Sequence, residues 1–404
     1  MAVVISTVLK ILAAIVVFGI IILVHEFGHF IVARMMKVRV IEFAIGMGPR
    51  LLKWGKKDTT YSLRLFPLGG FCSMEGEDEG APTPSALGGH ADTDGEEALL
   101  PSEDTEEIAA QEPVVLPPDT SRSFAHKKVW QRILIVIAGA FMNLLLGFIL
   151  ILCYNLFCTS GDYVLAHLSC TTTIATVGEE FDTPLKPGDT IVKMDGERLY
   201  SYMDFVTFLQ TDEDGKFDVL IERPQADGTK AEQLLEDVDF YLTTDEETGL
   251  RYLDYEMQFY VYLPTAGTIV QQTAKQEFSI LVYTVRSLKY MLQGKYGLND
   301  LSGPVGTIDI IGDAVQNAVT EEDRSVGVGF LLFLVALLTI NIGVVNILPL
   351  PALDGGRLLF LIWEGITRRP VPPKYEGIVH LVGMILLVLL SIVIAFSDVL
   401  KIFG

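Results

Sequence analysis

Cysteine is scarce in this sequence, and its few cysteines are poorly spaced for metal binding. Cys72, Cys153, Cys158 and Cys170 form no CxxC pair, so the sequence gives no support for a cysteine-based zinc site or a thioredoxin-like motif. Cys158 and Cys170 could form a disulfide outside a membrane. Geometry decides disulfides, so the sequence leaves this pairing open.

Basic residues are also few. There are 30 Lys and Arg against 51 Asp and Glu, which gives a formal net charge of −21. This acidic balance, together with the lack of a basic stripe or an RNA-binding signature, argues against nucleic acid as a partner. The sequence also contains no nucleophile elbow, Walker motif or dinucleotide-binding loop. Several common enzyme classes are therefore excluded.

Charged residues are rare in four long apolar runs, although the whole chain is strongly acidic. Each run has about the 20 residues that a helix needs to cross a bilayer. The runs are Ile11–Val32, Ile133–Cys153, Val326–Leu350 and Gly377–Ile394. The first is too long for the apolar part of a signal peptide and lacks a cleavage site. The sequence therefore predicts a polytopic α-helical membrane protein with four transmembrane helices.

The distribution of Lys and Arg predicts how these helices are oriented. Basic residues gather after the first run, before the second, and between the third and fourth, whereas the chain ends carry only Lys10 and Lys401. Loops rich in Lys and Arg stay on the cytoplasmic side. We therefore expect both termini, and the region between the second and third runs, to lie outside the cytoplasm.

Two polar regions separate the runs. Residues Glu75–Asp119 include many acids but no Lys, Arg or aromatic residue. We expect this stretch to be a disordered insertion, either a solvated loop or a regulatory docking segment. The outer region contains turns and alternating strands, for example at Leu185–Glu197, which predict a small β-rich domain. Glu277–Leu292 has the pattern of an amphipathic helix at the membrane surface.

The first apolar run ends in the sequence His25–Glu26–Phe27–Gly28–His29. Side chains at i and i+4 share a helix face, so the two imidazoles can bind one zinc ion while Glu26 acts as general base towards a metal-bound water. The alternative is an ordinary pair of surface histidines. Ionisable groups inside a membrane are costly unless they serve a function, which favours the metal site.

A third zinc ligand is predicted at the end of the third run. Pro349 and Pro351 break the helix there, and two glycines follow Asp354. Asp354 is then at the same membrane depth as His25 and His29, although it could also be an ordinary acid before a turn. Asn346 offers an amide for substrate or backbone at this place.

The remaining polar residues of interest have no partner at metal-ligand spacing. We expect the other histidines, His90, His126, His167 and His380, to be solvated or structural. Asn143 in the second run is expected to hydrogen-bond between helices, with a catalytic role as the minority interpretation.

These motifs resemble the site-2 protease family of intramembrane metalloproteases, in particular the bacterial regulator-of-sigma-E type with an extracytoplasmic PDZ domain. The resemblance extends over almost the whole chain. It rests on the His25–His29 motif, on Asn346-x-x-Pro349-x-Pro351-x-x-Asp354–Gly355–Gly356, on Gly46–Pro49 and Phe66–Phe71, and on Ser302–Gly306.

The resemblance implies the fold and the substrate contacts. It implies a membrane-associated β-structure between Glu42 and Phe71, in which Gly69 and Gly70 contact substrate together with Asn346, Pro349 and Pro351. It also implies a PDZ-like α+β domain as a size filter. The expected parts are residues 1–35 with the histidine motif, 36–74 (β-region), 75–120 (insertion), 121–155 (second helix), 160–272 (PDZ-like), 275–325 (amphipathic helix and linker), 326–358 (third helix) and 375–398 (fourth helix).

The function predicted from these features is a Zn²⁺ endopeptidase in the lipid bilayer of a bacterial cytoplasmic membrane, active towards the cytoplasmic side. It would cleave single-pass membrane proteins, namely anti-sigma factors or remnant signal peptides, within or near their transmembrane segment. The alternatives are a non-proteolytic membrane adaptor or peptide-binding protein that keeps the fold, and a metal transporter.

Overall fold

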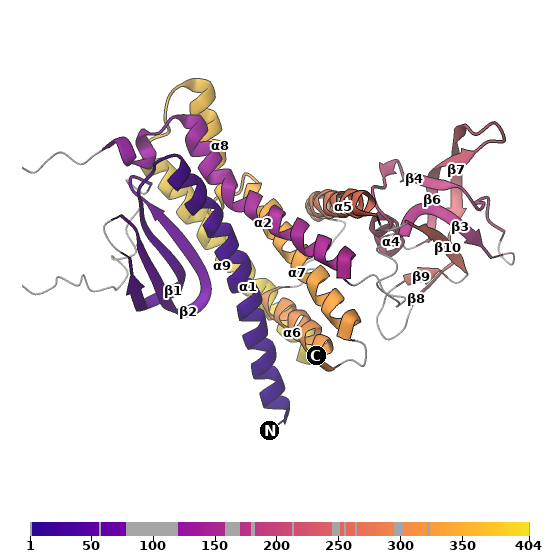
Figure 1. The fold of residues 1–404 in the computed structure, drawn as a ribbon, viewed down its shortest axis with the longest axis horizontal. Coiled ribbons are helices and arrows are strands. Elements are labelled where there is room, and N and C mark those ends of the chain that lie inside the picture. Colours follow the sequence, from indigo (N-terminus) through magenta and orange to yellow (C-terminus); the bar gives the residue numbers. More distant parts are fainter. Residues whose placement is uncertain are drawn as a thin grey trace, which may run out of the picture. The chain divides into compact units, whose positions relative to one another are not determined.

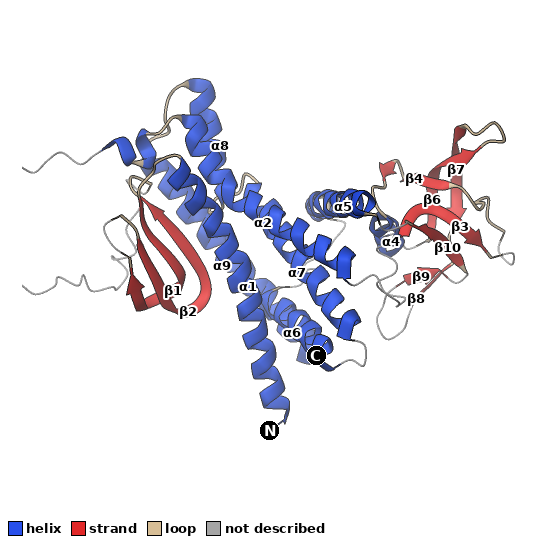
Figure 2. Ribbon diagram, viewed as in Figure 1, coloured by secondary structure: helices blue, strands red, loops and turns tan. Residues whose placement is uncertain are grey.

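Long helices and separate small sheets make up the structure (Figures 1 and 2). The computed structural model describes residues 2–55, 58–77, 120–157, 170–178, 182–211, 214–244, 251–253, 256–262, 265–294, 303–320 and 324–403. The predicted acidic insertion after Glu77 lies outside the described residues, and so do His90, Cys158 and His167. The chain divides into two units. One comprises Met1–His25, Gly139–Ile347 and Leu387–Gly404, and the other comprises Glu26–Ala138 and Leu348–Leu386.

Four of the helices are long and apolar enough to cross a membrane, as predicted. They are α1 (Ala2–Met35), α2 (Val129–Phe157), α7 (Arg324–Ile347) and α9 (Pro373–Phe403). The segments of these helices that could span a bilayer have mean hydropathies between 2.6 and 3.0. The third span was predicted to run to Leu350, but α7 ends at Ile347. Pro349 and Pro351 lack an N–H and cannot continue a helix, which explains the earlier end.

Two further helices were not predicted from the sequence. Helix α8 (Asp354–Thr367) follows the turn after α7, and α6 (Pro304–Thr320) lies where a linker was expected. Asp398 on α9 accepts hydrogen bonds from the Gly303 and Gly306 backbone N–H groups, at 3.1 and 2.9 Å. A carboxylate at a helix N-terminus satisfies donors that have no partner within the helix. The start of α6 therefore depends on a residue distant in sequence.

The amphipathic segment forms α5 (Ala266–Leu292), which starts earlier than the predicted Glu277. Thr265 begins the helix, because its side chain accepts a hydrogen bond from the Thr268 N–H. Buried polar side chains connect α5 to its neighbours. Asn155 of α2 donates to Thr273 and Gln276, and Thr284 donates to Asn341 of α7. The polar face of α5 is thus used in helix packing.

The predicted β-structure between Glu42 and Phe71 is present as two long antiparallel strands, β1 (Val40–Trp54) and β2 (Thr60–Met74). The strands fold back, so that Glu42 pairs both with Ser73 and with Thr60. Glu42 is buried and accepts hydrogen bonds from Ser62, Arg50 and Arg64 at 2.5, 2.8 and 3.0 Å. Burial would raise the pKa of Glu42, but these three donors outweigh it and hold that pKa below its ordinary value.

A β-rich domain follows α2. Its main antiparallel sheet has the order β10–β3–β4–β6–β7, with β5 paired to β4 and with β8 paired to β9 separately. The strands are β3 (Cys170–Val177), β4 (Thr190–Met194), β5 (Glu197–Arg198), β6 (Lys216–Pro224), β7 (Lys230–Asp239), β8 (Leu242–Thr244), β9 (Arg251–Leu253) and β10 (Met257–Val261). Helix α4 (Tyr202–Thr211) covers its apolar core, where Phe205 packs against Phe240 and Phe259. The finer PDZ-like assignment stays a prediction.

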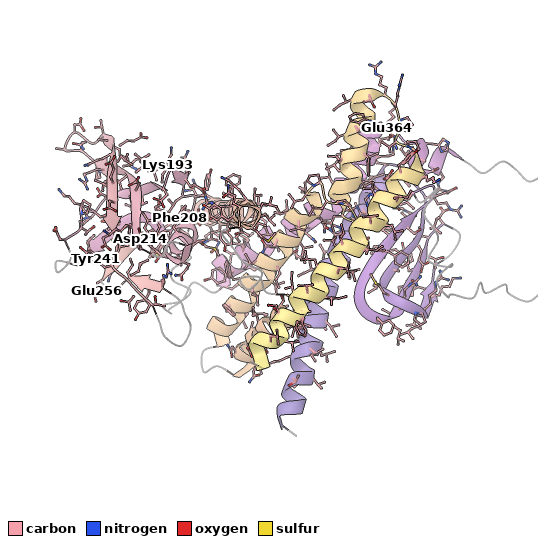
Figure 3. All side chains as sticks on the ribbon, turned by 180° about the vertical axis from the view of Figure 1, so that it is seen from behind. Lys193, Phe208, Asp214, Tyr241, Glu256 and Glu364 are labelled. Atoms are coloured by element: carbon pink, nitrogen blue, oxygen red, sulfur yellow. The ribbon has the colours of Figure 1, made fainter. Side chains whose placement is uncertain are left out.

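The contact between α5 and this domain is both electrostatic and aromatic. The guanidinium of Arg286 lies 4.9 Å from the ring centre of Phe208, which Figure 3 marks on α4. Arg286 also forms an ion pair with Glu197 of β5. A cation held over an aromatic ring and paired with a carboxylate orients the helix against the domain.

We expect Asp189→Ala to destabilise the β-rich domain. Asp189 is fully buried and accepts hydrogen bonds from the Arg223 guanidinium, both at 2.7 Å, and from the Lys186 N–H at 2.8 Å. Arg223 is partly exposed, so its charge can still be hydrated, and the loss of these hydrogen bonds should cost about 1–3 kcal/mol. Hydrogen exchange of the full chain should show faster exchange in β4 and β6. Unchanged protection there would contradict the expectation. Asp227→Ala, on an exposed turn, is the control.

Candidate metal centre

Helix α1 carries both predicted histidine ligands. It is continuous from Ala2 to Met35, so His25 and His29 are one helical turn apart on the same face. Both are buried, with 8% of each residue exposed. The Nδ1 atom of His29 lies 2.8 Å from the Ile135 carbonyl oxygen of α2. A carbonyl can only accept, so Nδ1 carries a proton and Nε2 is the ring nitrogen left to bind a metal.

A sharply bent turn between α7 and α8 positions Asp354. Ala352 has a positive φ of 74°, and its N–H donates to Nδ1 of His380 on α9 at 3.0 Å. Gly356 allows the chain to fold back closely, since a Cβ there would lie 2.5 Å from the Leu350 oxygen. His380 was expected to be structural or solvated. It holds the turn that precedes a predicted ligand.

His25, His29 and Asp354, the three predicted ligands, form one group that could hold a metal ion. One ligand atom from each lies within 4.8 Å of the others. Nε2 of His29 is 3.2 Å from Oδ2 of Asp354. Two ligands of a tetrahedral zinc, each about 2.0–2.1 Å from the metal, are roughly 3.3 Å apart. Nε2 of His29 and the carboxylate oxygen of Asp354 are at nearly this distance, so the three side chains fit a zinc ion.

Asn143 of α2 lies beside the other histidine. Its side chain is fully buried, and its amide nitrogen is placed 3.4 Å from Nδ1 of His25. Among the described residues, the Asn143 Oδ1 atom has no hydrogen-bond partner. The two ends of an asparagine amide are assigned from the hydrogen-bond network. Turning this amide by 180° brings Oδ1 to Nδ1–H of His25 and leaves Nε2 of His25 for the metal, as for His29.

The predicted base, Glu26, lies next to the β-structure. A Cβ atom at Gly70 of β2 would lie 3.6 Å from Cγ of Glu26 and 2.8 Å from the Ala44 carbonyl oxygen. A side chain at position 70 would thus displace the strand or Glu26. At Gly69, where φ is +88°, an added Cβ would instead lie 2.8 Å from Cε of Met47. Of the two predicted substrate contacts on β2, Gly70 is therefore the one beside the base.

The other predicted site residues lie in or near the turn after α7. Asn346 is half-buried in the last turn of α7, and Pro349 is exposed. Pro351 packs against α9, where a Cβ at Gly383 would lie 2.2 Å from the Pro351 Cβ. This contact gives Pro351 a structural role, while the substrate contacts stay predictions. His126 is exposed in a short 3₁₀ segment before α2.

A two-histidine, one-carboxylate centre with an adjacent glutamate on a membrane helix defines a class of protein, the membrane metallopeptidases. The chain belongs to peptidase family M50, whose family model matches residues 13–390. This is the site-2 protease family that the motifs resemble.

Curated relatives match nearly the whole chain. Zinc metalloprotease RasP of Shouchella clausii is 29% identical and covers 97% of this chain and 99% of its own length. The regulator of sigma-W protease RasP of Bacillus subtilis has the same identity and coverage. A putative zinc metalloprotease of Fusobacterium nucleatum is 31% identical, again over 97% and 99% of the two chains. The chain is accordingly a site-2-type zinc metalloprotease and a multi-pass membrane protein.

We expect Asn143→Leu to weaken metal binding, because His25 would lose the acceptor that orients its ring. Loss of such a partner typically lowers metal affinity by roughly tenfold to a hundredfold. Zinc competition with a chelator on the purified full chain measures this directly. Asn143→Asp, which keeps an acceptor, should restore most of the affinity.

The matched control for this prediction is Asn155→Leu. Asn155 is also buried on α2, but it hydrogen-bonds Thr273 and Gln276 of α5. An equal loss of zinc affinity in both leucine variants would mean that Asn143 acts only through general packing of α2.

Proposed function

We propose that this protease hydrolyses peptide bonds of single-pass membrane proteins within or near their transmembrane segment. In this proposal His25, His29 and Asp354 hold the zinc ion and Glu26 is the general base. One observation carries the proposal: Nε2 of His29, on a helix long and apolar enough to cross a membrane, lies 3.2 Å from Oδ2 of Asp354 in the first turn of α8. Ionisable groups at a membrane helix are costly unless they serve a function.

The chain's own residues have defined roles in the proposed reaction. Bound zinc supplies a water of near-neutral pKa and polarises the scissile carbonyl. Glu26 accepts the proton of the attacking water and then delivers it to the leaving amine, as a general base and then acid. The hydrogen bond to Ile135 holds the His29 ring in place, and the His380–Ala352 bond holds the Asp354 turn.

The substrate is proposed to bind as an extended strand next to β2. The Phe66–Met74 part of β2 pairs with β1 along one edge, and no other described strand pairs with it. Backbone groups on an open edge bind an added strand, and an unwound segment exposes the peptide bond that a helix shields. Gly70, in this part of β2, adjoins Glu26. Asn346, Pro349 and Gly69 are also proposed to contact the substrate.

Orientation and substrate class form the finer part of the proposal. Lys and Arg flank the ends of the spans near His29 and Asp354, which favours the cytoplasmic side for the active site and the outside for both termini. One relative is named as a regulator of sigma-W protease, and the relatives are bacterial. We therefore infer a bacterial cytoplasmic membrane and, as substrates, anti-sigma factors or remnant signal peptides.

A membrane adaptor and a metal transporter fit the chain less well than a protease. A non-proteolytic adaptor would have no use for Glu26 beside two ligands. A transporter would be expected to show more polar residues along several spans than the four candidate spans offer. The family membership favours the protease over both alternatives.

We expect Glu26→Gln to keep about the wild-type zinc content but to abolish cleavage of a reconstituted single-pass model substrate. The glutamine retains the shape of Glu26 but cannot accept a proton, and loss of a general base costs roughly 10²–10⁴-fold in rate. Metal analysis and a cleavage assay are made on the same preparations, and Asp354→Ala should lose zinc as well as cleavage. Undiminished cleavage by Glu26→Gln would refute the assignment of the base.

A well-folded wild type without zinc would refute the metal site itself. Comparison with Glu75→Gln, which removes a carboxylate outside the proposed site, controls for a general effect of removing one acid. This variant is expected to retain both zinc and cleavage.

A further inference from the structure

A basic cavity lies where α1 ends and α2 begins. It has a volume of about 610 Å³, and its polar lining consists of Arg34, Lys37, Asp58, Ser121, Arg122 and Lys127. All of these residues belong to the same unit of the chain as β1 and β2. We call this cavity the basic pocket. Nothing in the proposed cleavage reaction uses it.

Positive charge dominates the basic pocket. Four cationic side chains face one carboxylate, that of Asp58, whose Oδ1 is 3.2 Å from the Arg122 guanidinium. The pKa of Asp58 is held below its ordinary value by Arg122 first, and also by Arg39 and Arg34. The single acid is therefore already compensated. The remaining positive charge is available for an anionic ligand.

The cationic groups are held in place before any ligand binds. Lys127 Nζ donates to the Ser121 carbonyl at 2.8 Å, and the Arg34 guanidinium donates to Thr59 at 3.4 Å. The backbone N–H of Arg39 donates to the Arg122 carbonyl at 3.0 Å and joins the two chain segments. Each arginine has five N–H donors, so donors are left over for phosphate oxygens.

The position of the basic pocket in the chain identifies the kind of anion. Arg34 is in the last turn of α1, and Lys127 lies two residues before α2, so the pocket is where two candidate spans leave the apolar layer. Phosphates of lipid headgroups lie at this level. Trp130, in the first turn of α2, is 53% exposed, and exposed tryptophans are typical of the membrane interface.

We propose that the basic pocket binds the phosphate headgroup of an anionic phospholipid. Basic pockets between membrane helices are known to take such headgroups. The other source of negative charge is the acidic segment of this chain, but only the lipid headgroup is held at the level of the pocket by the bilayer itself. The proposal depends on membrane insertion and not on the proposed cleavage.

The test uses the full chain in detergent and an acyl-labelled phosphatidylglycerol as probe. The variant Arg34→Gln/Lys37→Gln/Lys127→Gln removes three charges from the pocket. The control, Lys186→Gln/Lys216→Gln/Lys230→Gln, removes the same charge from exposed positions of the β-rich domain. We expect the wild type to bind phosphatidylglycerol saturably, without competition from phosphatidylcholine. The affinity for phosphatidylglycerol should be about tenfold or more lower in the pocket variant and unchanged in the control. An unchanged zinc content shows that the pocket variant is folded.

Three outcomes would overturn the proposal. Equal affinity in the pocket variant and the control would mean that the lipid binds elsewhere. Competition by inorganic phosphate at the same concentration as phosphatidylglycerol would assign the pocket to free phosphate. Binding that appears only after deletion of residues 78–118 would assign it to the acidic segment, whereas the proposal expects this deletion to change lipid affinity by less than about twofold.

Discussion

The proposed metal centre depends on the hydrogen bond by which helix α2 fixes the His29 ring. A neutral histidine has one donor and one acceptor, and a backbone carbonyl such as that of Ile135 can take only the donor. The other nitrogen of His29 must then face the centre. Burial makes this choice strict, because no water competes for the Nδ1–H group of a residue that is 8% exposed. The Ile135 carbonyl of α2 thus determines which ring nitrogen of His29 faces the proposed metal site.

Further polar contacts surround the turn that carries Asp354. His380 on α9 accepts a hydrogen bond from a backbone N–H of the turn before Asp354. Arg357, one helical turn after Asp354, forms ion pairs with Glu77, which follows β2, and with Glu376 on α9. Partly buried opposite charges are costly to separate. These contacts connect α8, the segment after β2 and the start of α9 around Asp354, the proposed third ligand.

Much of this arrangement was predictable from the sequence, because it follows from local periodicity. The four spans need only hydropathy, and the His25–His29 pair needs only the i, i+4 spacing. Asp354 required one further argument, that of equal depth. The role of Ile135 could not be predicted, since any residue offers a carbonyl, and for Asn143 the sequence indicated a bond between helices but not its partner. The double pairing of Glu42 escaped prediction because strand register depends on tertiary contacts.

The cap on helix α6 has a consequence for how the protein is made. The carboxylate of Asp398, which receives the Gly303 and Gly306 N–H groups, is synthesised 95 residues after Gly303. A nascent chain inserted span by span exposes the start of α6 without its acceptor until the final helix has left the ribosome. Synthesis of α9, rather than insertion of α7, therefore completes the packing of this region.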